Sequence, residues 1–264
     1  MKKNLPTELL YQIFALLIAF IVVHALYVAV IRPNADADLR AKAEQLAANP
    51  DAVTEDSFYV VMKDYEQESC LVLMLWALAI LGYKGRDTWR QQRLGERDLL
   101  DLPPGMPIGK EDTHLLSERL AALPAQMRDW VLPRALATAI ERFAATGNVQ
   151  DVSTSARDVC DSEGGRMESE LSIIRYIAWA IPSVGFIGTV RGIGDALGQA
   201  HKAVEGDITG VTESLGVAFN STFIALIISI VLMFFIHQIQ LMQERLVLDT
   251  ERYVDREFIR KLRP

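Results

Sequence analysis

The sequence predicts an all-α polytopic membrane protein with four transmembrane helices and cytoplasmic helical extensions. Half of the 264 residues are hydrophobic, yet the chain also carries 27 basic and 34 acidic residues. The apolar residues form long uncharged blocks, and the charged residues lie between these blocks. A water-soluble enzyme would instead spread its apolar residues at the period of helices or strands. The block pattern therefore indicates helices that cross a lipid bilayer.

Two of the blocks are long enough to cross the bilayer without help. Residues 9–31 contain no Asp, Glu, Lys or Arg over 23 positions, and residues 215–236 contain none over 22. About 20 apolar residues in a helix cross the hydrocarbon core, which is roughly 30 Å thick. These two segments are therefore predicted to be the first and the last spans.

The second and third spans are shorter. Residues 176–190 are uncharged over 15 positions, and this block reaches Leu197 if Arg191 and Asp195 are tolerated within it. Residues 70–83 are uncharged over only 14 positions, a length that is also typical of a buried or re-entrant segment. Flanking aromatic and basic side chains would lengthen this span by snorkelling to the interface.

The basic residues predict how the spans are oriented. Residues 32–68 carry four basic and nine acidic residues, and the loop 199–214 carries one lysine. Because basic residues mark the cytoplasmic side, four spans with both termini in the cytoplasm satisfy every loop, whereas three spans would place a basic cluster outside. The basic clusters before the first span and after the second and fourth spans are Lys2 and Lys3; Lys84, Arg86, Arg90, Arg93 and Arg97; and Arg245, Arg252, Arg256, Arg260, Lys261 and Arg263.

A cleaved signal peptide is the alternative interpretation of the first block. Lys2 and Lys3, the apolar core and Ala35-Asp36-Ala37 resemble the three parts of such a signal. However, the apolar core is much longer than the roughly 7–15 residues of a signal peptide. An uncleaved first span is therefore the preferred interpretation.

The spans divide the chain into five predicted parts. They are the cytoplasmic N-terminus with the first span (1–31), an acidic periplasmic segment (32–68), the short second span (69–83), a cytoplasmic helical region (84–172), and the hairpin of the third and fourth spans with a cytoplasmic C-terminal helix (173–264).

Apolar periodicity and helix breakers predict further helices outside the spans. Helices are expected over 36–48, 113–123 and 125–146, with breaks at Asn49-Pro50 and Leu102–Pro107 and a C-terminal cap at Gly147. A helix from about Asp151 is expected to fray at Gly164-Gly165, and another from Arg166 is expected to enter the third span. The fourth span is expected to continue far beyond residue 236, because apolar residues recur there at near-heptad spacing.

Nothing in the sequence predicts an enzyme, a cofactor, a metal site or binding to nucleic acid. Cys70 and Cys160 would lie on different sides of the membrane, and the chain has no CxxC motif or His/Cys cluster with zinc spacing. It also has no Walker loop and no pattern of a catalytic triad. His24 lies within the first span and is either a proton relay or, as we prefer, a hydrogen-bonded interhelical histidine.

Small residues form a stripe on each of the last two spans. In lipid, small residues let helices approach closely, so plain helix packing would explain both stripes. The hydroxyl groups of Thr189, Ser221 and Thr222 also permit a second interpretation, in which they line an ion path or bind an acidic residue of a partner. At helical spacing, the stripes are Gly185, Gly188, Thr189, Gly192 and Ala196 on the third span and Ala218, Ser221, Thr222, Ala225 and Ser229 on the fourth.

The same region resembles the MotA/TolQ/ExbB proton-channel family. The resemblance covers roughly residues 166–262. Four spans are more similar to MotA, whereas the Gly-Thr-Val sequence is more similar to ExbB and TolQ. The motifs that carry it are Pro182-x-x-Gly185-x-x-Gly188-Thr189-Val190-x-Gly192-Ile193 and Gly210-Val211-x-Glu213-Ser214-Leu215.

The resemblance implies a homo-oligomer, a pentamer in family members, around a pair of single-span partner helices of the MotB/ExbD/TolR type. Each partner helix carries an essential aspartate, and proton or sodium flow along that interface drives mechanical work. By position, Thr189 matches the pore threonine of the third span, Ser221 and Thr222 match the hydroxyl positions of the last span, and Pro182 matches the proline that bends the third span. The chain departs from the family pattern by lacking a late proline in the last span and by having Arg191 at a usually apolar position.

The uncharged blocks agree with a need for such a partner, because they contain no Asp or Glu that could carry a proton. Arg191 has two interpretations. It either pairs with Asp195 one turn away and snorkels to the outer interface, or the arginines of five copies ring the outer mouth of the pore and lower the pKa of the partner's aspartate. Arg191 and Asp195 are therefore the candidate residues of the pore mouth.

The expected function is that of an ion-conducting, stator-type subunit of the bacterial inner membrane, with the proton as the expected ion. With its Asp-bearing partner, it would convert ion-motive force into mechanical work across the envelope. The alternatives are a non-conducting membrane scaffold that uses the same packing and, less favoured, a sensor that relays an envelope signal.

Overall fold

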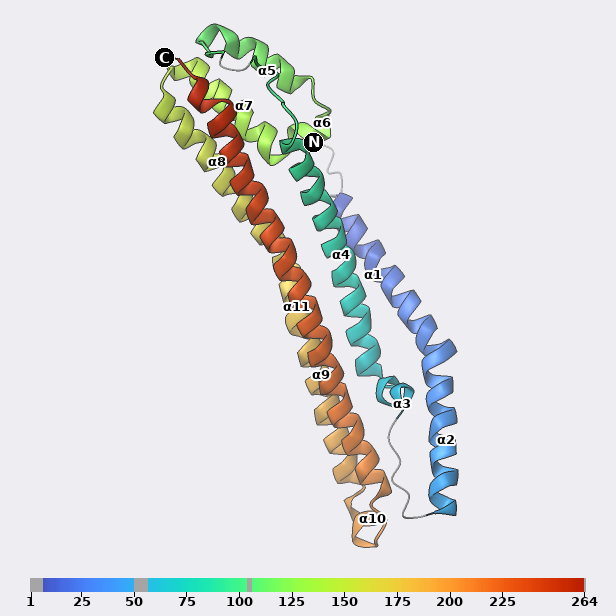
Figure 1. The fold of residues 1–264 in the computed structure, drawn as a ribbon. Helices are drawn as coiled ribbons and strands as arrows, with labels where there is room; N and C mark the ends of the chain where they lie inside the picture. Colours follow the sequence, from blue (N-terminus) through green and yellow to red (C-terminus); the bar gives the residue numbers. More distant parts are fainter. Residues whose placement is uncertain (1–6, 50–56, 104–105, 264) are drawn as a thin grey trace. The chain divides into compact units, whose positions relative to one another are not determined.

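The computed structural model describes residues 7–49, 57–103 and 106–263. Within these ranges the chain is almost entirely helical, and the only β-type pairing is a parallel bridge between Ile108 and Leu262. Four helical runs in the described ranges are long and apolar enough to cross a membrane (Figure 1). The predicted all-α fold with four candidate spans is therefore confirmed. Residues that entered the topology and helix-break predictions but lie outside the described ranges are Lys2, Lys3, Pro50, Pro104 and Gly105.

Each of the four runs contains one of the predicted spans. The runs are Leu9–Ala48, Tyr65–Gly95, Val149–Gly198 and Thr209–Lys261. The block of 14 uncharged residues lies inside a helix of 31 residues, so the helix does not end where the uncharged block ends.

The chain forms two compact units, each built from two segments. Unit 1 comprises Met1–Leu81 and Ile173–Ile236, and unit 2 comprises Gly82–Ser172 and His237–Pro264. The boundaries fall close to the predicted ends of the second, third and fourth spans. Unit 1 therefore collects the apolar blocks, and unit 2 collects the polar helices.

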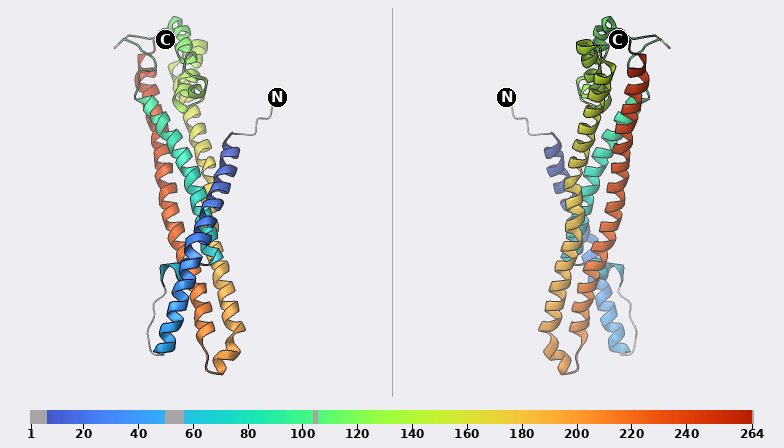
Figure 2. Two further views of the ribbon diagram at one scale, coloured as in Figure 1. Left: turned by 90° about the vertical axis from the view of Figure 1, so that its right-hand side faces the viewer. Right: turned by 90° about the vertical axis from the view of Figure 1, so that its left-hand side faces the viewer.

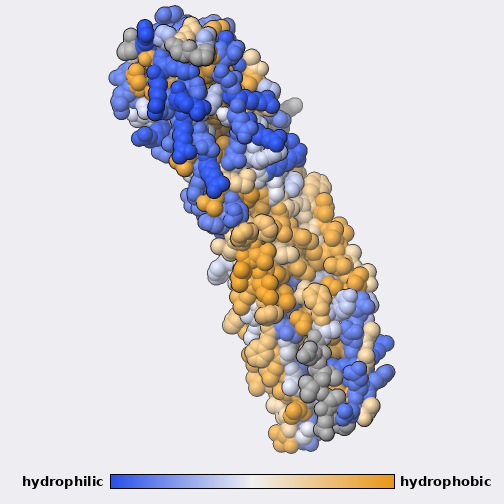
Figure 3. Space-filling view, viewed as in Figure 1, coloured by the Kyte–Doolittle hydropathy of each residue, from blue (hydrophilic) through white to orange (hydrophobic). Residues whose placement is uncertain are grey.

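Unit 1 is built from long helices. Its α9 and α11 lie side by side, joined through α10 (Figures 1 and 2). Its surface carries many exposed apolar side chains, which form a broad hydrophobic area in Figure 3. The helices of unit 1 are α1 (Thr7–Leu26), α2 (Arg32–Ala48), α3 (Phe58–Met62), the first part of α4 (Tyr65–Gly95), α9 (Ser172–Gly198), α10 (Ala200–Val204) and the first part of α11 (Thr209–Glu257).

The first span continues directly into the acidic segment. α1 passes through a π-helical turn, Tyr27–Ile31, into α2, and the run reaches Ala48. The sequence predicts a separate helix from residue 36, so the absence of an intervening break is a difference. Pro33 lacks a backbone donor, and the wider hydrogen-bond register of the π-helical turn directly before it lets the helix continue past the proline.

Unit 2 is a helical bundle around its own apolar core. The phenyl rings of Phe143 and Phe258 meet edge to face at 6.4 Å, and both are fully buried with Leu116 and Leu136. Its helices are the rest of α4, a 3₁₀ turn (Lys110–Asp112), α5 (Thr113–Ala121), α6 (Ala125–Arg128), α7 (Val131–Thr146), α8 (Val149–Glu170), the rest of α11 and a 3₁₀ turn (Ile259–Lys261).

Two helix predictions in unit 2 are wrong in detail. The single helix expected over 125–146 is divided into α6 and α7, because the ring of Pro133 would clash with the carbonyl of Asp129 in a continuous helix. The chain is extended at Trp130 and starts α7 with the proline in its first turn. The expected cap is confirmed, since Gly147 has a left-handed φ of 65°.

The expected fraying at Gly164-Gly165 is also wrong. α8 continues through both glycines to Glu170. The buried carboxylate of Glu163 next to them forms ion pairs with Arg134 and Arg166, and such tertiary contacts outweigh the low helix propensity of glycine. α8 and α9 are separated by a turn at Leu171 instead of forming the continuous helix that the sequence predicts.

Candidate functional site

The predicted small-residue stripes face each other between α9 and α11. A Cβ atom added to Gly185 would lie 2.5 Å from the Cβ of Ala225, and one added to Gly192 would lie 2.8 Å from the Cβ of Ala218. These separations are shorter than any real contact between carbon atoms. The glycines therefore allow the two helix backbones to approach more closely than any larger residue would permit.

A hydroxyl cluster lies at this close contact. The hydroxyls of Thr189 and Thr222 are hydrogen-bonded to each other across the two helices. Thr189 also lies 3.1 Å from the carbonyl oxygen of Ala218, and Thr222 donates to the carbonyl oxygen of Gly185 at 3.0 Å. Each hydroxyl has one proton and several acceptors within reach, so the cluster has alternative hydrogen-bond arrangements.

Ser221 occupies a different part of the contact. Its side chain is buried and donates to the Val217 carbonyl of its own helix at 2.7 Å. A Cβ atom added to Gly188 would collide with the side chain of Ser221 and would lie 3.0 Å from the side chain of Glu66. The structure thus brings Thr189 and Thr222 together as the sequence suggests, whereas Ser221 hydrogen-bonds locally and packs against α9.

Pro182 lies inside α9 and leaves the carbonyl of Ala178, four residues earlier, without its usual backbone donor. The hydroxyl of Ser229 on α11 donates to this oxygen at 3.0 Å. An unpaired carbonyl in an apolar environment is costly. Ser229 therefore stabilises the proline position in α9 from the neighbouring helix.

Arg191 forms its ion pair with a residue that the sequence reasoning did not consider. Its guanidinium makes two parallel hydrogen bonds of 2.8 Å to the carboxylate of Glu66 at the start of α4. Asp64 lies 4.0 Å away, and its burial raises the pKa of that carboxyl above the ordinary value. Asp195 is exposed, and among the described residues no ion pair joins it to Arg191, so the expected pairing one turn away is replaced by the pairing with Glu66.

A second buried carboxylate, Glu68, connects the first helical run to α4. It accepts from the ring Nδ1 of His24 at 2.7 Å and from the guanidinium of Arg32 at 2.5 Å. The preferred interpretation of His24, a hydrogen-bonded interhelical histidine, matches this contact. Glu66 and Glu68 are both almost completely buried. Their position directly before an apolar block is the sequence feature from which pairing with basic side chains could have been predicted.

The hydroxyl cluster lacks a group that can store a proton. Hydroxyl groups relay hydrogen bonds, but at neutral pH they do not store a proton. In the described part of the uncharged blocks no carboxylate is present, and the nearest buried carboxylates, Glu66 and Glu68, are engaged by basic side chains. The described residues also contain no cluster of His, Cys, Asp and Glu that could hold a metal ion.

The comparison with family models confirms the resemblance. Residues 127–252 match the model of the MotA/TolQ/ExbB proton channel family, so this segment is similar to that family. Together with the four apolar helical runs, the match supports a multi-pass membrane protein. The match begins at residue 127, earlier than the resemblance from about residue 166, and it includes all of α7 and α8. No curated protein and no solved structure matches the chain.

Proposed function

We propose that this chain is the ion-conducting, ring-forming subunit of a stator-type complex that converts ion-motive force into mechanical work across the envelope. It acts with a single-span partner that carries an aspartate within the membrane, and the conducted ion is the proton. The chain lies in the bacterial inner membrane with both termini in the cytoplasm, in agreement with the basic clusters of its loops.

The observation that carries this proposal is the hydroxyl pair Thr189–Thr222 inside the segment that matches the family model. The two hydroxyls come from different helices and lie in otherwise apolar blocks. Each can donate to a carboxylate or accept from a carboxylic acid. This is the property that a proton path beside an aspartate requires.

The partner supplies what the uncharged blocks lack. A protonatable group inside the membrane is the usual carrier in a proton path, and none is present in these blocks. Several copies of the chain, five by the family resemblance, surround two partner helices, so that each Thr189–Thr222 pair in turn meets a partner aspartate. The exposed apolar surface of unit 1 is available for contacts with neighbouring copies and lipid.

A non-conducting scaffold is the second candidate. It is favoured by the fact that both threonine hydroxyls already have backbone acceptors within the hairpin. Helix packing alone explains that arrangement. The two candidates differ in whether removing a hydroxyl changes ion flux without changing assembly.

The test combines native mass spectrometry with proton flux in proteoliposomes. Under the stator proposal, the protein is extracted as a ring that holds two copies of an Asp-bearing single-span protein. Thr189→Val and Thr222→Val then keep the ring but lower flux about tenfold or more, the expected effect of losing a hydrogen bond to a charged group. Thr212→Val, which removes an exposed hydroxyl before the fourth block, serves as the matched control.

Flux that is unchanged in both variants would support the scaffold. A ring with an empty centre, or a monomer or dimer without such a partner, would rule out the stator proposal altogether.

A further inference from the structure

A row of arginines follows the second predicted span on α4. Arg86, Arg90 and Arg93 recur at intervals of four and three residues and therefore share one face of the helix. Arg97 continues the row in the turn after α4 ends. All four side chains are exposed, and none forms an ion pair with another residue in the part of the chain that the structure describes.

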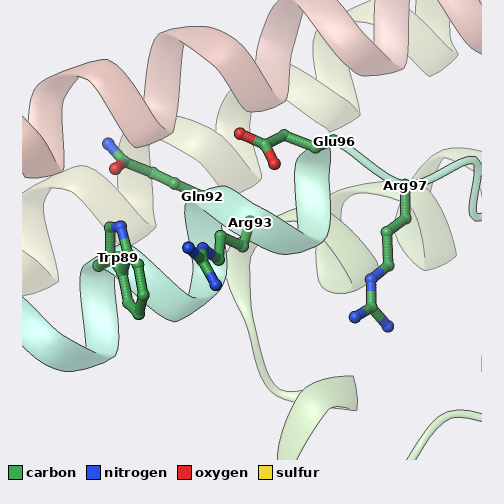
Figure 4. A pocket seen from close by; sticks show the side chains of 5 residues that line it. All are labelled: Trp89, Gln92, Arg93, Glu96 and Arg97. Carbon is green, nitrogen blue, oxygen red and sulfur yellow. The ribbon is translucent and has the colours of Figure 1, made fainter.

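Trp89 holds one of these arginines in place. The guanidinium of Arg93 lies over the indole ring, 3.8 Å from its centre. Stacking uses the flat face of the guanidinium and leaves its edge N–H groups free to bind a phosphate in a bidentate manner. An open hollow of about 540 Å³ adjoins the pair and is lined by Trp89, Gln92, Arg93, Glu96 and Arg97. In Figure 4 the carboxylate of Glu96 points to the opposite side of the helix from Arg93 and Arg97.

The row begins where the bilayer surface is predicted. At about 1.5 Å per residue, Arg86 and Arg90 lie about 5 and about 10 Å along the helix beyond Tyr83, the last residue of the uncharged block. The headgroup layer extends roughly 5–8 Å beyond the hydrocarbon core, and long basic side chains reach back toward it. Tyr83 and Trp89 are exposed, and such aromatic side chains are typical of the membrane interface.

We propose that Arg86, Arg90 and Arg93 with Trp89 form a binding site for the headgroup of an anionic phospholipid, and that Arg97, farther from the bilayer, adds to the positive potential of the site. Unpaired positive charges directly after a span match a negatively charged leaflet. The stacked Arg93 and the adjoining hollow provide a place for one phosphate. The proposal does not depend on whether the chain conducts ions.

The test is native mass spectrometry of the full-length protein in detergent, titrated with phosphatidylglycerol or phosphatidylcholine of identical acyl chains. The wild type should retain phosphatidylglycerol preferentially. Arg90→Gln/Arg93→Gln should weaken phosphatidylglycerol binding about tenfold to thirtyfold, as expected for two basic residues at a membrane surface, and leave phosphatidylcholine binding unchanged. The matched control Arg128→Gln/Arg157→Gln removes two exposed charges from the same unit and should bind lipid like the wild type.

Equal losses in both double variants, or no loss in either, would overturn the proposal. Two competitors identify other ligands of the same charge. Displacement of the lipid by millimolar inorganic phosphate would assign the site to free phosphate, and preferential binding of a poly-glutamate peptide would assign it to an acidic protein. A second measurement uses Trp89→Phe: quenching of fluorescence by brominated phosphatidylglycerol in proteoliposomes should fall in this variant, and an unchanged signal would contradict contact with the headgroup.

Discussion

The hydroxyl of Ser229 donates a hydrogen bond to the carbonyl oxygen of Ala178 at 3.0 Å, across the contact between α11 and α9. That oxygen is the one that Pro182 leaves without a backbone donor. The proline inside one helix and a serine of the next are therefore energetically linked.

We expect Ser229→Ala to lower the free energy of unfolding by about 1 kcal/mol in the wild type, because it leaves a buried carbonyl unpaired. In a Pro182→Ala background the backbone N–H of residue 182 can bond to Ala178, so the same change should cost almost nothing. A double-mutant cycle from equilibrium unfolding in mixed detergent measures this difference. If Ser229→Ala lowers the free energy of unfolding equally in both backgrounds, Ser229 does not compensate for the backbone donor that Pro182 lacks.

Two glycines of α9 should respond in opposite ways to the same substitution. Gly192→Ala places a Cβ 2.7 Å from the Ser214 carbonyl oxygen and should destabilise the hairpin by about 1–3 kcal/mol through overpacking. Gly194→Ala meets nothing within 4 Å and should be neutral or stabilise by up to about 1 kcal/mol through helix propensity. Unfolding measured side by side tests both, and equal effects would contradict the close α9–α11 contact.

Substituting either member of the Arg191–Glu66 pair should destabilise the protein by a similar amount. Glu66→Gln should destabilise unit 1 by about 1–3 kcal/mol, since Glu66 is almost fully buried and the change removes the carboxylate charge from its bidentate pair with Arg191. Arg191→Leu should have a similar effect, and the double variant should cost less than the sum of the two. Asp195→Asn is the control and should leave stability unchanged.

The same variants test whether Arg191 acts at a pore mouth. Proton flux in proteoliposomes that is lowered equally by Glu66→Gln and Arg191→Leu would indicate that the pair acts by holding α4 and α9 together. Flux that is unchanged in Arg191→Leu would remove the pore role of this residue.

The C-terminal turn should weaken in acid. Hydrogen bonds from Lys261 and Arg256 hold the pKa of the Glu257 carboxyl below its ordinary value near 4.5. A lowered pKa in the folded state means that the stabilisation is present above the ordinary value and is lost as the pH falls through the lowered one. The protection of the amides after residue 257, measured as the hydrogen-exchange rate relative to the intrinsic rate at each pH, should therefore fall in that range. Glu257→Gln should abolish the pH dependence of this protection, and a persistent dependence would assign it to another group.

The spans could be predicted because charge and hydropathy are encoded locally along the chain. The length of α11 was predictable for the same reason, since apolar residues continue at helical spacing after residue 236. The division between α6 and α7 could have been read from Pro133. The continuity of α8 through two glycines could not be predicted, because it depends on the ion pair of Glu163 with Arg134 of another helix.

The candidate site shows the same limit. Sequence spacing placed Thr189 and Thr222 on the small-residue stripes of the two spans, and the structure shows that these stripes face each other and join the two hydroxyls. It suggested Asp195 as the partner of Arg191, because residues four apart on a helix are neighbours. The partner in the structure, Glu66, is 125 positions away in the sequence, and no local pattern identifies such a pair.

The unbroken run from Leu9 to Ala48 has a mechanical consequence. Its 40 residues correspond to about 60 Å of helix, twice the thickness of the hydrocarbon core. Its hydrogen-bond register changes at the π-helical turn Tyr27–Ile31, and Glu68 contacts His24 before this turn and Arg32 after it. Glu68 therefore braces the helix across the turn, so a push on the acidic end would tilt the rod as a whole and transmit force to α4.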